Sequence, residues 1–230
     1  MLTELKAGHL SLGYYGIVPA TEFIDGETLA QKIGLCAGTV IHHDEDWIQY
    51  VIDRRVCLVA KRPLRYGISW NAIDEVGAVF GEQQVSIQGQ TFKVRLMRGS
   101  RTNPMTFKIG DNPDTTWGSE WNRVMYRLCE EDRVYLGEGL NHASNAGSVG
   151  VDEIGDEAPP EKEIWEHFKQ TDLGVSNQPQ WGMCSWCQEA CSVLDVPKVR
   201  LLRGRYNGMF AREPSWDGVV TGWRPVLERV

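Results

Sequence analysis

The sequence has no long apolar run and no surplus of positive charge. No stretch of about 18 consecutive apolar residues occurs in its 230 residues, and the first residues, MLTELKAGHLSLGYYGIV, do not combine a basic region with an apolar core. Its 24 Lys and Arg are outnumbered by 31 Asp and Glu, for a formal charge of −7. Surfaces that bind nucleic acid or anionic membranes need clustered positive charge. We therefore expect a soluble protein, assembled in the cytoplasm, whose partners are proteins or glycans, with no nucleic acid and no membrane.

Motifs of common catalytic sites are also missing. The sequence contains no G-x-S-x-G, no P-loop and no G-x-G-x-x-G, and Gly137-x-Gly139 lies in a polar stretch rather than between a strand and a helix. Six cysteines in 230 residues are too sparse for a small domain held together by disulfides. Three of them, Cys36, Cys57 and Cys129, lie among apolar residues and are predicted to be buried thiols. The sequence therefore predicts no enzymatic activity and no cofactor.

The other three cysteines, Cys184, Cys187 and Cys191, have the most metal-like spacing. A structural zinc ion needs about four ligands, usually supplied as two pairs. The nearest histidine is His167 and no second pair follows, so packing is favoured, although whether these thiols bind a metal stays open. The run 42–46, with two histidines and three acids, is a second candidate. Adjacent side chains point apart, so a solvated turn is the favoured interpretation.

Helical periodicity is strong in only two segments. A helix is predicted near 69–80, with Ser69 as its N-cap and apolar residues close to one face. A second is predicted near 119–131, where apolar residues recur at helical spacing. These residues are Trp121, Val124, Met125, Leu128 and Cys129. A shorter helix is predicted over DGETLAQKIG, closed by Gly34 in a left-handed conformation.

Short stretches rich in Val, Ile and aromatic residues predict strands between these helices. WIQYVID and RVCLVAK face each other across Asp53-Arg54, which predicts a hairpin, and a second hairpin is predicted around Gln88-Gly89. The nine tryptophans are unusually many for this length. In a fold with few long helices, such rings fill the space between loops and short strands.

The C-terminal segment, 198–230, is predicted to hold short strands at both ends and an irregular middle interrupted by glycines. Aromatic and Arg side chains gather in this middle, which is typical of recognition loops and equally of a core beneath a long loop. The candidate contact residues are Tyr206, Asn207, Met209, Phe210, Arg212 and Trp216. After them, Trp223, Val226 and Leu227 are predicted to be core, and Arg200 and Arg224 to be structural.

The segment also carries a resemblance to a known family. VRLLRG (199–204) and the closing GWRPVL (222–227) resemble the end of the formylglycine-generating-enzyme-type C-type lectin fold, which sulfatase-modifying oxidases share with variable receptor-binding proteins of phages. Three upstream pieces, GSEWNRVMYRLC (118–129), TDLG (171–174) and SWCQE (185–189), resemble phage virion and tail-fibre proteins in the same order, as does the run 47–73. The resemblance covers most of the chain.

This resemblance implies an α+β fold. It implies a single C-type-lectin-like domain over 1–230, with two main helices, short antiparallel strands, much irregular structure and a long acidic surface insertion near 137–163. It also implies a structural protein of a phage tail, at the fibre, tip or baseplate. Such a protein binds other virion proteins and a host-surface glycan or protein, and works as a homo-oligomer, with a trimer favoured. In the phage receptor-binding proteins the segment between the two closing strands is exposed and variable, which implies receptor contact by the six candidate residues.

Two alternatives stay open. One is an architectural virion component, an adaptor or decoration protein whose loops contact only neighbouring subunits. The other is an oxidase of the formylglycine-generating type, which needs catalytic cysteines shortly after the R-G strand end. The stretch RGRYNGMFAREPSWDG contains no cysteine, so the non-catalytic interpretation is favoured.

Overall fold

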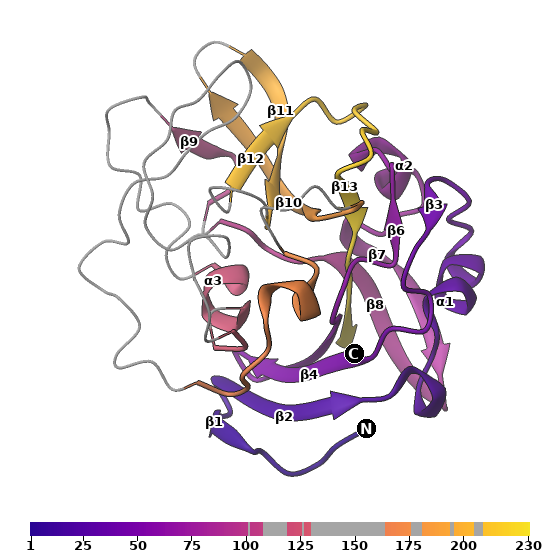
Figure 1. Ribbon diagram of the computed structural model, residues 1–230, viewed down its shortest axis with the longest axis vertical. Coiled ribbons are helices and arrows are strands. Elements are labelled where there is room, and N and C mark those ends of the chain that lie inside the picture. The colour runs from indigo at the N-terminus through magenta and orange to yellow at the C-terminus, as the bar shows by residue number, and fades with distance from the viewer. Residues whose placement is uncertain are drawn as a thin grey trace.

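Two β-sheets form the framework of the computed structural model (Figure 1). The structure describes residues 1–100, 102–107, 119–125, 127–129, 164–175, 181–193, 196–204 and 209–230. The predicted acidic insertion near 137–163 therefore lies outside the described residues.

The first sheet is antiparallel, and the C-terminal strand lies near its middle. Its strands, in order across the sheet, are β1 (Ala7–His9), β2 (Leu12–Val18), β4 (Trp47–Ile52), β5 (Arg55–Ala60), β14 (Pro225–Arg229), β8 (Gln90–Leu96) and β7 (Phe80–Ile87). In β14, Val226 lies opposite Val59 of β5 on one side and Arg95 of β8 on the other. The end of the chain thereby connects two hairpins formed earlier in the sequence.

The second sheet is mixed. Its strands, in order, are β12 (Met209–Arg212), β11 (Val196–Arg203), β10 (Cys184–Val193), β13 (Thr221–Trp223), β6 (Arg65–Tyr66) and β3 (Thr39–Val40), and β9 (Met105–Phe107) also pairs with β10. Strand β10 pairs in parallel with β13 and β9 and antiparallel with β11. In Figure 1, β10 to β12 occupy the upper part of the view, while β2 and β4 lie along the bottom.

Both predicted hairpins are confirmed. Asp53 and Arg54 connect β4 to β5 with φ angles of 50° and 65°, and Gln88 and Gly89 connect β7 to β8 with φ angles of 51° and 75°. Two consecutive positive φ angles match the right-handed twist of the paired strands, as in type I′ turns. The register of the first sheet follows from these two turns.

The helices are short. They are α1 (Gly26–Ile33), α2 (Trp70–Glu75) and α3 (Glu120–Met125), with 3₁₀ turns η1 (Ala20–Glu22) and η4 (Gln170–Leu173). Helix α1 is as predicted: the Asp25 carboxylate accepts a hydrogen bond from the Thr28 N–H at 2.8 Å, and Gly34 ends the helix at a φ of 74°.

The expected α+β, C-type-lectin-like fold with two main helices is wrong. The described residues are mostly β, and among them α1 is the only helix of seven or more residues. Helix α2 begins after Ser69 as predicted but ends at Glu75, because Gly77 takes a positive φ of 69° and turns the chain into β7. The segment predicted as a helix over 69–80 therefore divides into one helical turn and a half, a turn and the start of a strand.

Helix α3 also ends earlier than the sequence pattern predicts. It begins after Ser119 and ends at Met125, and Cys129 then forms an isolated parallel bridge with Phe168. The five apolar residues of this segment are all fully buried, at 0% exposure. Apolar spacing thus predicted which side chains are buried but not how far the helix continues.

The first sheet is buried on both faces at β4, whereas its outer strands β1 and β7 have exposed residues. All six residues of β4 are buried, and because side chains alternate along a strand they enter two different clusters. Trp47 joins a first core cluster that includes Trp186 and Trp223, whereas Ile48 joins a second core cluster that includes Trp121 and Trp165. The second sheet packs on one face of the first, and α3 with the segment around Trp165 packs on the other.

The C-terminal segment supplies core residues as predicted. Trp223, Val226 and Leu227 are fully buried. Arg224 is buried too, donates to the Leu173 carbonyl and lies 5.4 Å from the Trp121 ring centroid, and Arg200 stacks 3.8 Å from the Trp70 ring centroid, so the structural roles expected for both arginines are confirmed.

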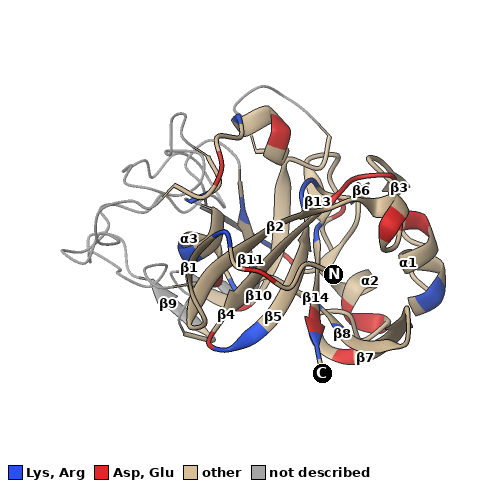
Figure 2. Cartoon of the chain, turned by 90° about the horizontal axis from the view of Figure 1, so that it is seen from below, with Lys and Arg blue, Asp and Glu red and all other residues tan. Residues whose placement is uncertain are grey.

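Charged residues of both signs are distributed over the described elements, with acidic and basic side chains on the same helix in α1 (Figure 2). Among the residues that the structure describes, no helix has the length and apolar character needed to span a membrane.

Trp223→Ala should lower the free energy of unfolding by about 3–5 kcal/mol, because it removes a fully buried ring from the first core cluster. Urea denaturation followed by circular dichroism measures this. Trp181→Ala is the matched control, since 61% of that residue is exposed, and it should cost less than about 1 kcal/mol. Equal losses in the two variants would contradict the assignment of Trp223 to the core.

Candidate functional site

The structure describes only part of the predicted contact segment. Met209, Phe210 and Arg212 lie in β12, which pairs antiparallel with β11, so this part of the expected irregular middle is a strand. Tyr206, Asn207 and the side chains of Met209 and Phe210 lie outside the described residues. The roles proposed for these four therefore stay predictions.

Arg212 and Trp216 are brought together, as a pair at the base of the segment. The Arg212 guanidinium lies 5.0 Å from the Trp216 ring centroid, and both side chains are half-buried. Trp216 also packs against the first core cluster, and a Cβ atom at Gly218 would lie 2.4 Å from the ring. Part of the Trp216 ring therefore has a structural role, whereas the sequence predicted that this residue would be an exposed contact residue.

An exposed aromatic pair lies beside this loop. Trp181 is 61% exposed and stacks on Tyr66, with 5.1 Å between ring centroids and 15° between ring planes. The Gly182 N–H donates to the Val219 carbonyl at 3.0 Å, which holds Val219, itself 58% exposed, next to the pair. We call these three residues, Tyr66, Trp181 and Val219, the aromatic surface.

Sequence reasoning missed Trp181. The residue lies in the polar stretch SNQPQWGM, where no apolar period gives its ring a side to pack on. A tryptophan in such a polar stretch was the available signal that the ring is exposed.

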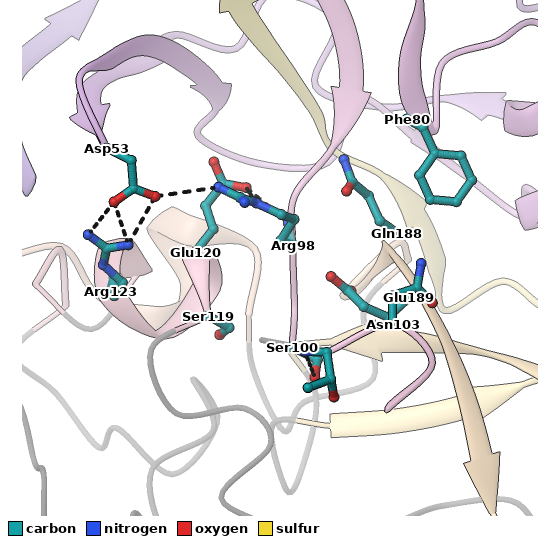
Figure 3. Close-up of a pocket in the computed structure, with 11 residues that line it drawn as sticks. Asp53, Phe80, Arg98, Ser100, Asn103, Ser119, Glu120, Arg123, Gln188 and Glu189 are labelled. Atoms are coloured by element: carbon teal, nitrogen blue, oxygen red, sulfur yellow. Dashed lines mark hydrogen bonds and ion pairs between the residues drawn. The ribbon is translucent and has the colours of Figure 1, made fainter. Parts of the chain in front are cut away.

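A second site is a polar pocket of about 280 Å³ that is formed where the start of β7, the chain after β8, β10, α3 and the β4–β5 turn meet (Figure 3). Figure 3 shows Phe80 at one edge and the ion pair of Asp53 with Arg123 at the other. The pocket is lined by Asp53, Phe80, Arg98, Ser100, Thr102, Asn103, Ser119, Glu120, Arg123, Gln188 and Glu189. Sequence reasoning did not identify this site, because its residues come from five separate parts of the chain.

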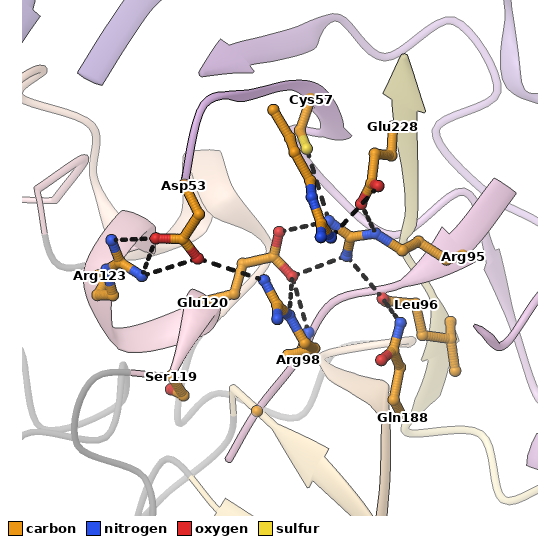
Figure 4. A network of polar contacts seen from close by, with 12 residues as sticks. Asp53, Cys57, Arg95, Leu96, Arg98, Ser119, Glu120, Arg123, Gln188 and Glu228 are labelled. Atoms are coloured by element: carbon orange, nitrogen blue, oxygen red, sulfur yellow. Dashed lines mark hydrogen bonds and ion pairs between the residues drawn. The ribbon is translucent and has the colours of Figure 1, made fainter. Parts of the chain in front are cut away.

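One wall of the pocket is fixed by a buried ion pair between Glu120 and Arg95 (Figure 4). The two terminal guanidinium nitrogens of Arg95, Nη1 and Nη2, each donate to the Glu120 carboxylate at 2.7 Å. The Tyr50 hydroxyl donates to the same carboxylate at 2.7 Å. Burial by itself would raise the pKa of Glu120, but the charge and hydrogen bonds of Arg95, with the backbone N–H of Arg98, lower the pKa to about 2. Glu120 is therefore an ionised structural residue at neutral pH.

Glu189, on β10, is the contrasting carboxyl group of the pocket. It is 3% exposed, and one of its oxygens accepts a hydrogen bond from the Gly99 N–H at 3.0 Å. Among the described residues no side chain pairs with this carboxylate. Burial raises its pKa to about 7, and hydrogen bonds from backbone N–H groups only partly oppose that shift. Glu189 therefore changes its charge near neutral pH.

The cysteines of β10 have surroundings that disfavour metal binding. Cys184, Cys187 and Cys191 are buried and form no disulfide, and burial raises the pKa of Cys187 and, to about 12, that of Cys191. A thiol binds metal as the thiolate, which such a pKa makes scarce. Within the described residues, no group of three or more His, Cys, Asp or Glu is placed to hold a metal ion.

Of the other cysteines, Cys57 and Cys129 are buried as predicted, whereas Cys36 is exposed, so its assignment to the core was wrong.

No protein-family model, curated protein or solved structure matches this chain. Function is therefore inferred from the two sites and from the motifs of the sequence.

The raised pKa of Glu189 predicts a pH-dependent stability. A folded-state pKa of about 7 against a reference of 4.5 means that its contribution is complete below about pH 4.5 and is lost as the pH rises through 7. Glu189→Gln cannot ionise, so relative to wild type its free energy of unfolding should increase by about 2–3 kcal/mol between pH 4.5 and pH 8. Chemical denaturation at each pH measures this difference.

Glu75→Gln, an exposed change of the same type on α2, is the control and should follow the wild-type curve at every pH. A difference between Glu189→Gln and wild type that stays constant across this pH range would contradict the assigned pKa.

Proposed function

We propose that the protein is a structural component of a phage tail, at the fibre, tip or baseplate, that binds the host surface without carrying out chemistry. Its motifs resemble phage virion proteins in order along the chain. The observation that carries the proposal is the exposed stack of Trp181 on Tyr66.

The exposure of Trp181 has no explanation in folding. The other described tryptophans are buried or half-buried, because a ring of this size contributes most when it is removed from water. Trp181 instead keeps most of its surface in solvent, and Tyr66 holds the ring in one orientation. A pre-oriented aromatic ring loses little conformational entropy on binding, and exposed tryptophans of this kind are frequent energetic centres of interfaces.

The chemistry of the surface fits a host-surface glycan or protein. A tryptophan face stacks on the apolar face of a sugar ring or of an aliphatic side chain, while its N–H remains a hydrogen-bond donor. Val219 extends the apolar area and lies in the same C-terminal segment as Arg212 and Trp216. We therefore propose one contact region that joins the aromatic surface to the six residues predicted from the sequence.

The proposed protein acts as a homo-oligomer, with a trimer favoured, because virion proteins commonly assemble as symmetric copies. An architectural role for the same surface, covered by a neighbouring subunit, is the alternative that the following experiment separates.

Trp181→Ala should lower the rate of adsorption to host cells by about tenfold or more while particle assembly stays normal, because truncating a central aromatic contact costs about 2 kcal/mol or more. The measurement uses particles of the encoding phage assembled with either chain, counted by electron microscopy and assayed for adsorption. Leu10→Ala, at an exposed apolar residue of the β1–β2 turn, is the control and should adsorb normally.

Two outcomes would overturn adhesion at this surface. Trp181→Ala particles that adsorb at the wild-type rate would show that the ring makes no receptor contact. Trp181→Ala chains that fold but fail to enter particles would replace adhesion with the architectural role.

A further inference from the structure

The polar pocket is not used by the proposed adhesion. None of the three residues of the aromatic surface lines it. The pocket also does not serve folding in an obvious way, since it places a carboxyl group, Glu189, in a buried position without a side-chain partner among the described residues. A buried ionisable group with no such partner is costly to the fold and marks a candidate binding site.

The side-chain amides of Gln188 and Asn103 lie beside Glu189. In each, one polar atom is hydrogen-bonded to the protein backbone and the other is left for a ligand. The Gln188 amide nitrogen donates to the Leu96 carbonyl at 2.9 Å, which leaves the Gln188 oxygen as an acceptor. The Asn103 oxygen accepts from the Ala190 N–H at 3.0 Å, which leaves the Asn103 nitrogen as a donor. These anchored ends fix the orientation of both amides, so acceptor and donor are presented in set positions.

The charged residues of the pocket are mostly neutralised by one another. Glu120 is paired with Arg95, and Asp53 is paired with Arg123 at 3.1 Å. Arg98 lies farther from its acidic neighbours, at 3.8 Å from Glu120 and 4.0 Å from Asp53. The lining is therefore polar on both the donor and the acceptor side rather than strongly charged, which disfavours a metal ion or a phosphate.

The remaining edge is aromatic. Phe80 is 42% exposed and packs edge-on against Trp70, with 6.0 Å between ring centroids, so its position is held from behind (Figure 3). An apolar ring beside a set of hydrogen-bond donors and acceptors is complementary to a sugar ring, which carries hydroxyl groups around its rim and C–H groups on its face.

We propose that this pocket binds a single sugar residue, with its hydroxyl groups on Glu189, Gln188 and Asn103 and its C–H face toward Phe80. Each sugar hydroxyl both donates and accepts a hydrogen bond, as the mixed lining requires. The volume of about 280 Å³ lies near the lower end of ligand pockets, at roughly 300 Å³, and so favours one ring over an oligosaccharide.

Saturation-transfer NMR tests the proposal with the full chain and five probes, glucose, galactose, mannose, rhamnose and N-acetylglucosamine, added one at a time. At least one probe should receive saturation on its C–H face. Glu189→Gln and Phe80→Ala should each weaken that binding by about tenfold or more, because the first removes a charge-assisted acceptor and the second the apolar platform. Glu75→Gln should leave it unchanged.

The part of the signal that Phe80→Ala removes should persist in Trp181→Ala, because Trp181 does not line the pocket, so this proposal and the proposed function fail separately. Absence of saturation for all five probes with the wild-type chain would overturn the proposal. A signal that is lost in Trp181→Ala but kept in Phe80→Ala would overturn it as well, since the sugar would then lie on the aromatic surface. If Glu189→Gln does not fold, the loss of binding in Phe80→Ala still tests the proposal.

Discussion

The buried ion pair of Arg95 with Glu120 is the interaction on which the rest of the structure depends. It joins β8 of the first sheet to α3, and Arg95 also donates to Glu228 of β14 at 2.8 Å. Removing two charges from water is expensive, and only a fully hydrogen-bonded geometry offsets that cost. The two-fold contact between guanidinium and carboxylate, completed by the Tyr50 hydroxyl, supplies such a geometry. Three segments distant in sequence are thereby held in one arrangement.

The same pair explains the form of the polar pocket. Glu120 accepts the backbone N–H of Arg98 at 3.0 Å, so the chain leaving β8 is fixed where it begins to form the pocket wall. Gly99 follows and donates its N–H to Glu189. Among the described residues, one carboxyl group is therefore held by a cation and the other by backbone N–H groups. Burial acts to raise the pKa of both, but Arg95 outweighs it at Glu120, whereas nothing outweighs it at Glu189. A structural anion and a titratable group result from two surroundings within one cavity.

Local patterns predicted turns and burial well but elements poorly. The hairpins at Asp53-Arg54 and Gln88-Gly89 were predictable because turn chemistry is local, and Ser69 marks the start of α2 for the same reason. The extents of α2 and α3 were not, since apolar spacing records which side chains face a core, and an irregular chain packed against a sheet shows similar spacing. The resemblance to a known family implied a helical content that the turn at Gly77 and the bridge between Cys129 and Phe168 do not allow.

The sites were harder to predict than the fold for a further physical reason. The pocket depends on residues such as Asp53, Phe80 and Glu189 that are unremarkable where they stand in the sequence and become a site only where β10, α3 and the chain after β8 approach one another. Aromatic content is equally uninformative by itself, because both core clusters contain several tryptophans and other large rings among their aliphatic residues. What distinguishes Trp181 is its exposure, since 61% of the residue stays in contact with solvent. Function in such a chain has to be inferred from the aromatic side chains that folding leaves exposed, and from the buried polar groups that folding leaves without a side-chain partner.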